Sequence, residues 1–232
     1  LGNERHLFSR AIAERQAQVL REAEYIAGAA DALQRLWTSR DEAWIQRHVA
    51  APIKGQLDYT LVLLANPGTD FIQVVVGPPI TPLPWEGQAV LRELAPLLAQ
   101  TAAAPALLGD PLGAGDEIGK VRGHARMQFL IGGPALVAAA PLATTEGSVV
   151  RGNAAPAVVV ASFLTGPFLR PVGLQLELRQ LRRVAATEPI DGDNFYDLRD
   201  TEQNLLGRFV WQPNRPAAEI VSNVMPLIGV AL

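Results

Sequence analysis

The sequence predicts an α+β fold, in which a five-stranded or slightly larger antiparallel sheet carries helices on one side. Three observations predict it: a proline-free run of good helix formers opens the chain, two β-rich segments flank a Pro-Gly turn, and three more strand-like segments follow a helical stretch. Hydrophobic residues make up 49% of the 232 residues and charged residues 19%, which is enough apolar surface for a folded core.

The opening run, residues 3–38, predicts one long amphipathic helix. Its apolar side chains recur at steps of three and four, at Phe8, Ile12, Val19, Ile26, Ala30, Leu33 and Trp37. Such a helix would extend roughly 50 Å, beyond the width of a small domain. We therefore expect a parallel homodimer through this helix, with Arg15 and Glu22 pairing across the axis and a seam of Phe8, Ile12, Val19, Ile26 and Ala30. The alternative is a long core helix of an α-helical bundle.

The remaining elements follow from changes in the period of the apolar residues. Ser39 and Asp41 supply N-cap chemistry for a second helix that runs to Val49, and Gly132-Gly133 predicts a tight turn between two strands. The pattern predicts strands over 58–64 and 71–76 around a turn at 66–70, a helix over 86–100, strands over 122–131, 135–143 and 157–164, a helix over 168–176, short strands over 179–185 and 205–212, and a last helix from Arg215.

Four segments, in order along the chain, carry a resemblance to a known family. They are Asp41-Glu42-Ala43-Trp44, Asp58-Tyr59-Thr60-Leu61-Val62-Leu63, Gly133-Pro134-Ala135-Leu136-Val137-Ala138-Ala139-Ala140-Pro141-Leu142 and Phe209-Val210-Trp211-Gln212-Pro213-Asn214-Arg215-Pro216. The ordered set resembles the CHASE4 domain, an extracytoplasmic sensor module of bacterial and archaeal signalling proteins. Family members often carry acidic residues after the tryptophan, where this chain has Ile45 and Gln46, so a role of those acids is not carried over.

The resemblance implies a PAS-like periplasmic sensor domain in an inner-membrane protein. It implies a signalling helix over residues 1–38, a PAS-like core over 39–214 and an exit helix over 215–232. Apolar spans are then expected before Leu1 and after Leu232, with a cytoplasmic output module beyond: a cyclic-di-GMP synthase or phosphodiesterase, or a histidine kinase. The alternative is a soluble small-molecule-binding or scaffold protein that is not connected to a membrane.

Composition and motifs argue against several functions. The net charge of −3 argues against a nucleic-acid partner, and the absence of cysteine removes disulfides, thiolate metal sites and cysteine nucleophiles. His6, His48 and His124 stand far apart, without metal-ligand spacing, and no nucleophile elbow or phosphate-binding loop is present. We therefore expect neither catalytic residues nor a metal or other cofactor in this domain.

The strongest ligand-binding candidate is the segment from Arg122 to Gln128. Strand alternation places Arg122, His124, Arg126 and Gln128 on one face, where cationic side chains suit a small anionic ligand. Tyr59 and Trp85 are candidates for further walls of that site. Two alternatives remain. One is a solvated sheet face without a ligand, and the other is an enzyme that would lose turnover in His124→Ala.

Overall fold

A computed structural model describes residues 2–29, 31–66, 71–77, 87–103, 121–142, 156–184, 188 and 194–212. The elements are α1 (Gly2–Gly28), a π-helical turn (Leu33–Thr38), α2 (Glu42–Ile45), a second π-helical turn (Gln46–Ala50), a short 3-10 turn (Lys54–Gln56), β1 (Thr60–Asn66), β2 (Phe71–Val76), α3 (Gly87–Ala103), β3 (His124–Leu130), β4 (Gly133–Pro141), β5 (Ala157–Phe163), α4 (Gly166–Gln175), β6 (Arg179–Val184), β7 (Phe195–Arg199) and β8 (Leu205–Gln212).

The first five strands form one antiparallel sheet in the order β2-β1-β5-β4-β3, which confirms the predicted five-stranded sheet. The turn between β3 and β4 lies one residue earlier than expected. Leu130 pairs with Gly133, so the turn residues are Ile131 and Gly132, with φ of 51° and 75°. A two-residue hairpin turn of this kind requires positive φ at both positions, and only the second is a glycine here.

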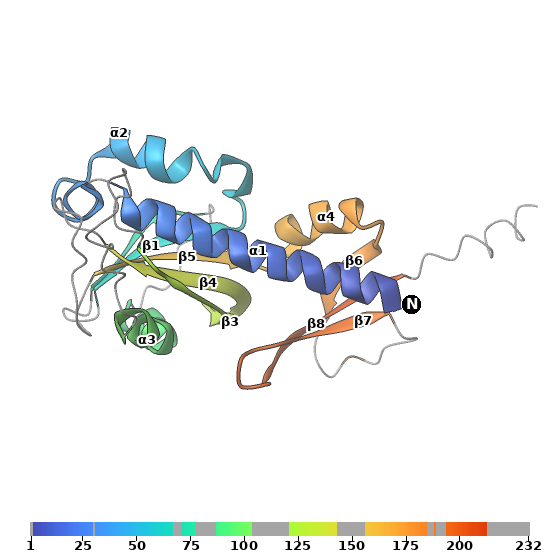
Figure 1. Cartoon of the computed structure of the whole chain (residues 1–232). Helices are drawn as coiled ribbons and strands as arrows, with labels where there is room; N and C mark the ends of the chain where they lie inside the picture. The colour runs from blue at the N-terminus through green and yellow to red at the C-terminus, as the bar shows by residue number, and fades with distance from the viewer. Residues whose placement is uncertain are drawn as a thin grey trace, which may run out of the picture.

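Helices cover both faces of this sheet, so the prediction of helices on one side is wrong. Figure 1 shows α1 along one face and α3 against the other, and the buried side chains divide into two clusters accordingly. The reason lies in β4 and β5, where consecutive residues such as Val158, Val159 and Val160 are all fully buried. Strands that are apolar on both faces need cover on both faces.

The opening helix is shorter than predicted and is part of the core. It has 27 residues and is about 40 Å long. The helical conformation is interrupted at Asp31, which adopts a φ of 62°. Aspartate tolerates this left-handed conformation better than most residues. The predicted seam residues Phe8, Ile12, Val19 and Ile26 are at most 2% exposed and pack in the chain's own core, so they are not available as a dimer seam. The fifth predicted seam residue, Ala30, lies outside the described residues.

A second, three-stranded sheet has the order β6-β8-β7. The two predicted strands are present, but β7 joins them and the three form a sheet of their own. Arg208 on β8 donates to Asp197 on β7, with 3.0 Å between Nη2 and Oδ2, and this bond holds the pKa of the Asp197 carboxyl below its usual value. The predicted exit helix over 215–232 lies outside the described residues.

The second sheet is joined to the start of α1. The indole Nε1 of Trp211 donates to Oε2 of Glu4 at 2.8 Å, and the Phe8 ring lies 5.4–5.8 Å from the rings of Tyr196, Phe209 and Trp211. Further along, α1 packs on β4 and β5 of the larger sheet. One helix therefore connects both sheets, and its first turns lie beside the last described strand.

Gly123 lets α1 and β4 approach each other closely just before β3. A Cβ atom at Gly123 would lie 2.6 Å from the Ala139 carbonyl oxygen and 3.1 Å from Leu20 Cδ1, while the Gly123 amide donates to Glu24 Oε1 at 2.9 Å. We expect Gly123→Ala to reduce the free energy of unfolding by about 1–3 kcal/mol, measured by urea denaturation, because the backbone must shift. Gly55→Ala is the control, since no atom lies within 4 Å of that Cβ position. Equal losses in the two variants would contradict the close approach.

Candidate functional site

Strand β3 brings three of the predicted site residues onto one face. His124, Arg126 and Gln128 pair with Ala139, Val137 and Ala135 of β4, and those three alanine and valine side chains belong to the buried cluster beneath α3. The predicted alternation is therefore confirmed for these positions, and their face is the one that α3 covers. Arg122 precedes β3 and is exposed, so strand geometry does not place it with the others.

The Gln128 side chain is bonded to α3 and is not free to bind a ligand. Its side chain is 7% exposed, and Nε2 donates to the carbonyl oxygen of Glu93 on α3 at 2.9 Å. The Glu93 carboxylate in turn accepts from the amide of Ile131 at 2.9 Å. Gln128 and Glu93 thus fix α3 against the β3–β4 turn, which keeps the neighbouring positions on β3 in a defined place.

His124 and Arg126 each present a buried nitrogen without a partner. Neither His124 Nδ1 nor Arg126 Nε has a hydrogen-bond partner among the residues that the structure describes. A buried donor or acceptor left unpaired costs about 1–3 kcal/mol, so such groups are ordinarily satisfied by a neighbour, water or a ligand. Two of them, two residues apart on one strand face, mark a polar position that a hydrogen-bonding molecule would stabilise.

The turn between β7 and β8 contributes charge near Arg126. Asp200 accepts hydrogen bonds from the amides of Glu202 and Asn204, each at 2.8 Å, and from the Asn204 side chain at 2.9 Å. The Asn204 side-chain bond is the main cause that lowers the pKa of Asp200, and the charge of Arg126 acts in the same direction. Arg126 therefore belongs to the larger sheet but lies within electrostatic reach of the smaller one.

Tyr59 lies with α1, away from the α3 face, so its prediction as a wall of the same site is wrong. It precedes β1, packs edge-on against Phe168 at 5.6 Å and has the Arg15 guanidinium 5.7 Å from its ring centre. Burial is the main cause that raises the pKa of the Tyr59 hydroxyl. The sequence analysis placed Tyr59 on the first strand, but β1 begins only at Thr60, so strand alternation does not determine the side on which Tyr59 lies. Trp85 lies outside the described residues.

A buried polar cluster under α1 was not predicted as such. Arg15 donates from Nε to Ser162 Oγ and from Nη2 to Thr60 Oγ1, both at 3.1 Å, and from Nη1 to Glu22 Oε1 at 3.2 Å. The Arg15 and Glu22 side chains are 7% and 11% exposed, and Thr60 and Ser162 are fully buried partners across the β1–β5 ladder. The sequence signal for this cluster was an arginine, Arg15, inside the apolar stripe of α1. The sequence analysis instead expected Arg15 and Glu22 to pair across a dimer axis.

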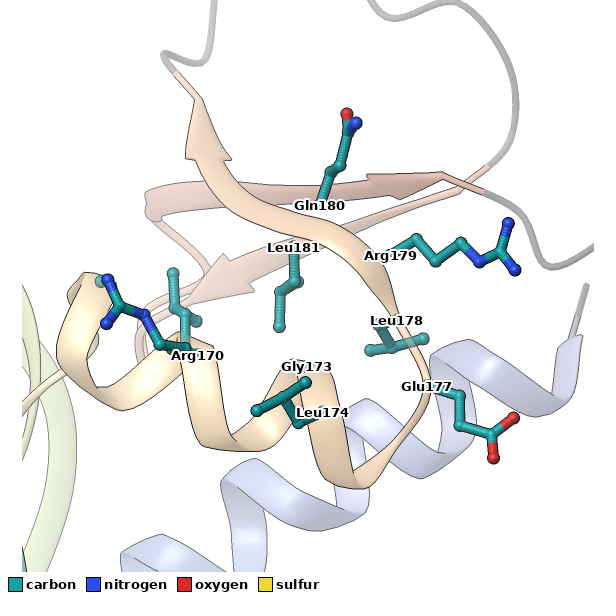
Figure 2. Close-up of a pocket in the computed structure, with 10 residues that line it drawn as sticks. Arg170, Gly173, Leu174, Glu177, Leu178, Arg179, Gln180 and Leu181 are labelled. Carbon is teal, nitrogen blue, oxygen red and sulfur yellow. The ribbon is translucent and has the colours of Figure 1, made fainter.

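The described residues also form a hollow between α4 and β6. This open groove has a volume of about 640 Å³, and Gly173, Leu174, Leu178 and Leu181 line it together with Arg170 and Arg179 (Figure 2). None of the predicted site residues that the structure describes lines it. It is separate from the His124–Arg126 position, which lies on the larger sheet.

Comparisons with known proteins do not assign a family. No protein-family model matches the sequence, and no curated protein has significant similarity to it. Among the described residues, no three acidic or histidine side chains gather as metal ligands would. In the same ranges no helix combines the length and the apolar character needed to cross a membrane.

Proposed function

We propose that this chain is an extracytoplasmic sensor domain that binds a small anion between β3 and α3 and has no catalysis of its own. The observation that carries the proposal is the pair of unpartnered buried nitrogens, His124 Nδ1 and Arg126 Nε, within the described residues. An arginine N–H and an imidazole can both donate to a carboxylate or a similar oxyanion. Gln128, held by Glu93, keeps the neighbouring backbone in place.

The packing of α1 supports a relay role. Its first turns contact the last described strand through Glu4 and Trp211, and its later turns pack on the sheet that carries His124 and Arg126. A ligand that favours one packing of the two sheets would therefore shift the position of α1 relative to β8. In a protein with a membrane span on each side of this domain, the two connections would leave from neighbouring positions.

The membrane context and the output module extend this proposal through the resemblance to CHASE4. The five-stranded antiparallel sheet with a helical crossing between β2 and β3 is compatible with the PAS-like core which that resemblance implies. Periplasmic location and a cytoplasmic cyclic-di-GMP enzyme or kinase follow from the same proposal. A homodimer through α1 stays a prediction, and its contact would use the exposed side of the helix, which carries Leu7 and Tyr25.

The ligand site is tested by thermal unfolding with acetate, succinate, citrate, phosphate and sulfate, each added singly. At least one of these anions is expected to raise the melting temperature, because a molecule that binds only the folded state stabilises it. Arg126→Ala is expected to weaken binding about 10- to 150-fold, which corresponds to a charge-assisted hydrogen bond of about 1.5–3 kcal/mol. Without added anion, the same variant should melt no lower than the original chain, since it removes an unpaired buried donor.

Arg92→Ala is the matched control, because Arg92 is an exposed arginine on α3. It should keep the full anion-induced shift. The site assignment fails if no anion stabilises the protein, or if Arg126→Ala and Arg92→Ala respond alike. The membrane part of the proposal is tested separately, by whether the full-length gene encodes apolar spans on both sides of this domain.

A further inference from the structure

The groove between α4 and β6 combines an apolar lining with charged ends. Leu169 and Leu178 line it and are buried, while Leu174 on α4 is 77% exposed. Figure 2 shows Leu181 directed from β6 toward α4. Leucines therefore line the middle of the groove, and its volume of about 640 Å³ lies within the range of small-molecule sites, about 300–1,000 Å³.

The corner that joins α4 to β6 gives the groove a fixed shape. The amide of Leu178 donates to the carbonyl oxygen of Gly173 at 2.8 Å, and Glu177 adopts a φ of 54°, which together form a Schellman ending of the helix. A Cβ atom at Gly173 would lie 3.3 Å from the Leu178 carbonyl oxygen and 3.4 Å from Leu181 Cβ, so helix and strand approach each other closely there. Backbone hydrogen bonds and this close approach therefore set the lining without a ligand.

The two ends of the groove differ in charge. Figure 2 shows Arg170 at one end, and Glu177 with Arg179 at the other. The charges of Glu177 and Arg179 sum to zero, whereas the Arg170 guanidinium is exposed and has no hydrogen bond or ion pair with any residue that the structure describes. Arg170 also lies toward the positive end of the α4 helix dipole. The Arg170 end therefore favours a negative charge, and the leucines between the two ends favour an aliphatic chain.

We propose that the α4–β6 groove binds a free monocarboxylate with a linear aliphatic chain, of the fatty-acid class. The carboxylate pairs with the Arg170 guanidinium, whose planar N–H groups match its two oxygens, and one arginine suits a single negative charge. The chain lies along Leu174, Leu178 and Leu181, and covers the exposed leucine. No lining residue belongs to β3 or α3, so this inference does not depend on the anion site proposed there.

Amide NMR titrations of the full chain with octanoate, 1-octanol and acetate test the groove. Signals over 166–181 report on it, while signals over 124–128 report on the position between β3 and α3, so the two sites are read separately. Over 166–181, octanoate is expected to bind saturably and about 3- to 10-fold more tightly than 1-octanol, which has the chain without the charge. Acetate, which has the charge without the chain, should bind there about 30-fold or more weakly than octanoate.

Two substitutions at exposed positions separate the head from the chain. Arg170→Ala should reduce the affinity for octanoate to that for 1-octanol and leave 1-octanol binding unchanged. Leu174→Asn should weaken both probes alike, because it removes apolar contact and no charge. Arg182→Ala is the matched control, since Arg182 is an exposed arginine on β6 that does not line the groove. It should keep the full affinity for octanoate.

Three results would overturn the proposal: no saturable shift over 166–181 with octanoate, equal affinities for octanoate and 1-octanol, or the same response of Arg170→Ala and Arg182→Ala. Sedimentation with phosphatidylglycerol vesicles, without saturable octanoate binding, would also overturn it, since that result assigns the surface to a lipid bilayer.

Discussion

Arg15→Ala is expected to reduce the free energy of unfolding by about 3–5 kcal/mol. The substitution removes the only described cation beside the buried carboxylate of Glu22, and it leaves the hydroxyls of Thr60 and Ser162 without the donors that they accept from. Removing one partner of a buried ion pair is costly because the other charge stays in a poorly solvated place. Urea or thermal unfolding of the purified chain measures the loss.

Arg10→Ala is the matched control on the same helix. Arg10 pairs with Glu14 at 2.8 Å, but both side chains are more than 60% exposed, so the loss should stay below about 1 kcal/mol. The double change Arg15→Met with Glu22→Leu should recover most of the stability, since it removes both buried charges and keeps apolar volume. If Arg15→Ala reduces the free energy of unfolding no more than Arg10→Ala does, the buried polar cluster under α1 does not contribute to stability as described.

Phe8→Ala is expected to cost about 3–5 kcal/mol, independently of protein concentration. Phe8 is fully buried and contacts the rings of Tyr196, Phe209 and Trp211, so its loss leaves a cavity where α1 meets the second sheet. Unfolding midpoints at two protein concentrations, tenfold or more apart, measure the effect and its dependence on association.

Leu7→Ala serves as the neighbouring control, because Leu7 is 37% exposed and its loss should cost about 1 kcal/mol or less. The concentration series separates two roles for Phe8. A core residue gives the same midpoint at both concentrations. A midpoint that falls on dilution in the original chain, and no longer does so in Phe8→Ala, would instead support the seam predicted from the sequence.

The candidate site shows how far strand periodicity reaches. Alternation correctly placed His124, Arg126 and Gln128 on one face, because side chains on a regular strand must alternate. It did not show that Gln128 is already bonded to Glu93, nor that Tyr59 lies on the face covered by α1. Both facts depend on which helix packs on which face, and a strand pattern carries no information on that choice.

The sequence by itself determined most of the described elements and their order, although not β7, and it located the cap at Asp41, whose side chain accepts from the Trp44 amide at 3.0 Å. These features arise from local periodicity, capping and turn chemistry over a few residues. The tertiary structure alone decided that α1 packs on its own sheets and that Arg15 meets Ser162, 147 residues away. An amphipathic stripe fixes only that a face will be buried, and partners at such separation are selected by packing and polar satisfaction across the whole fold.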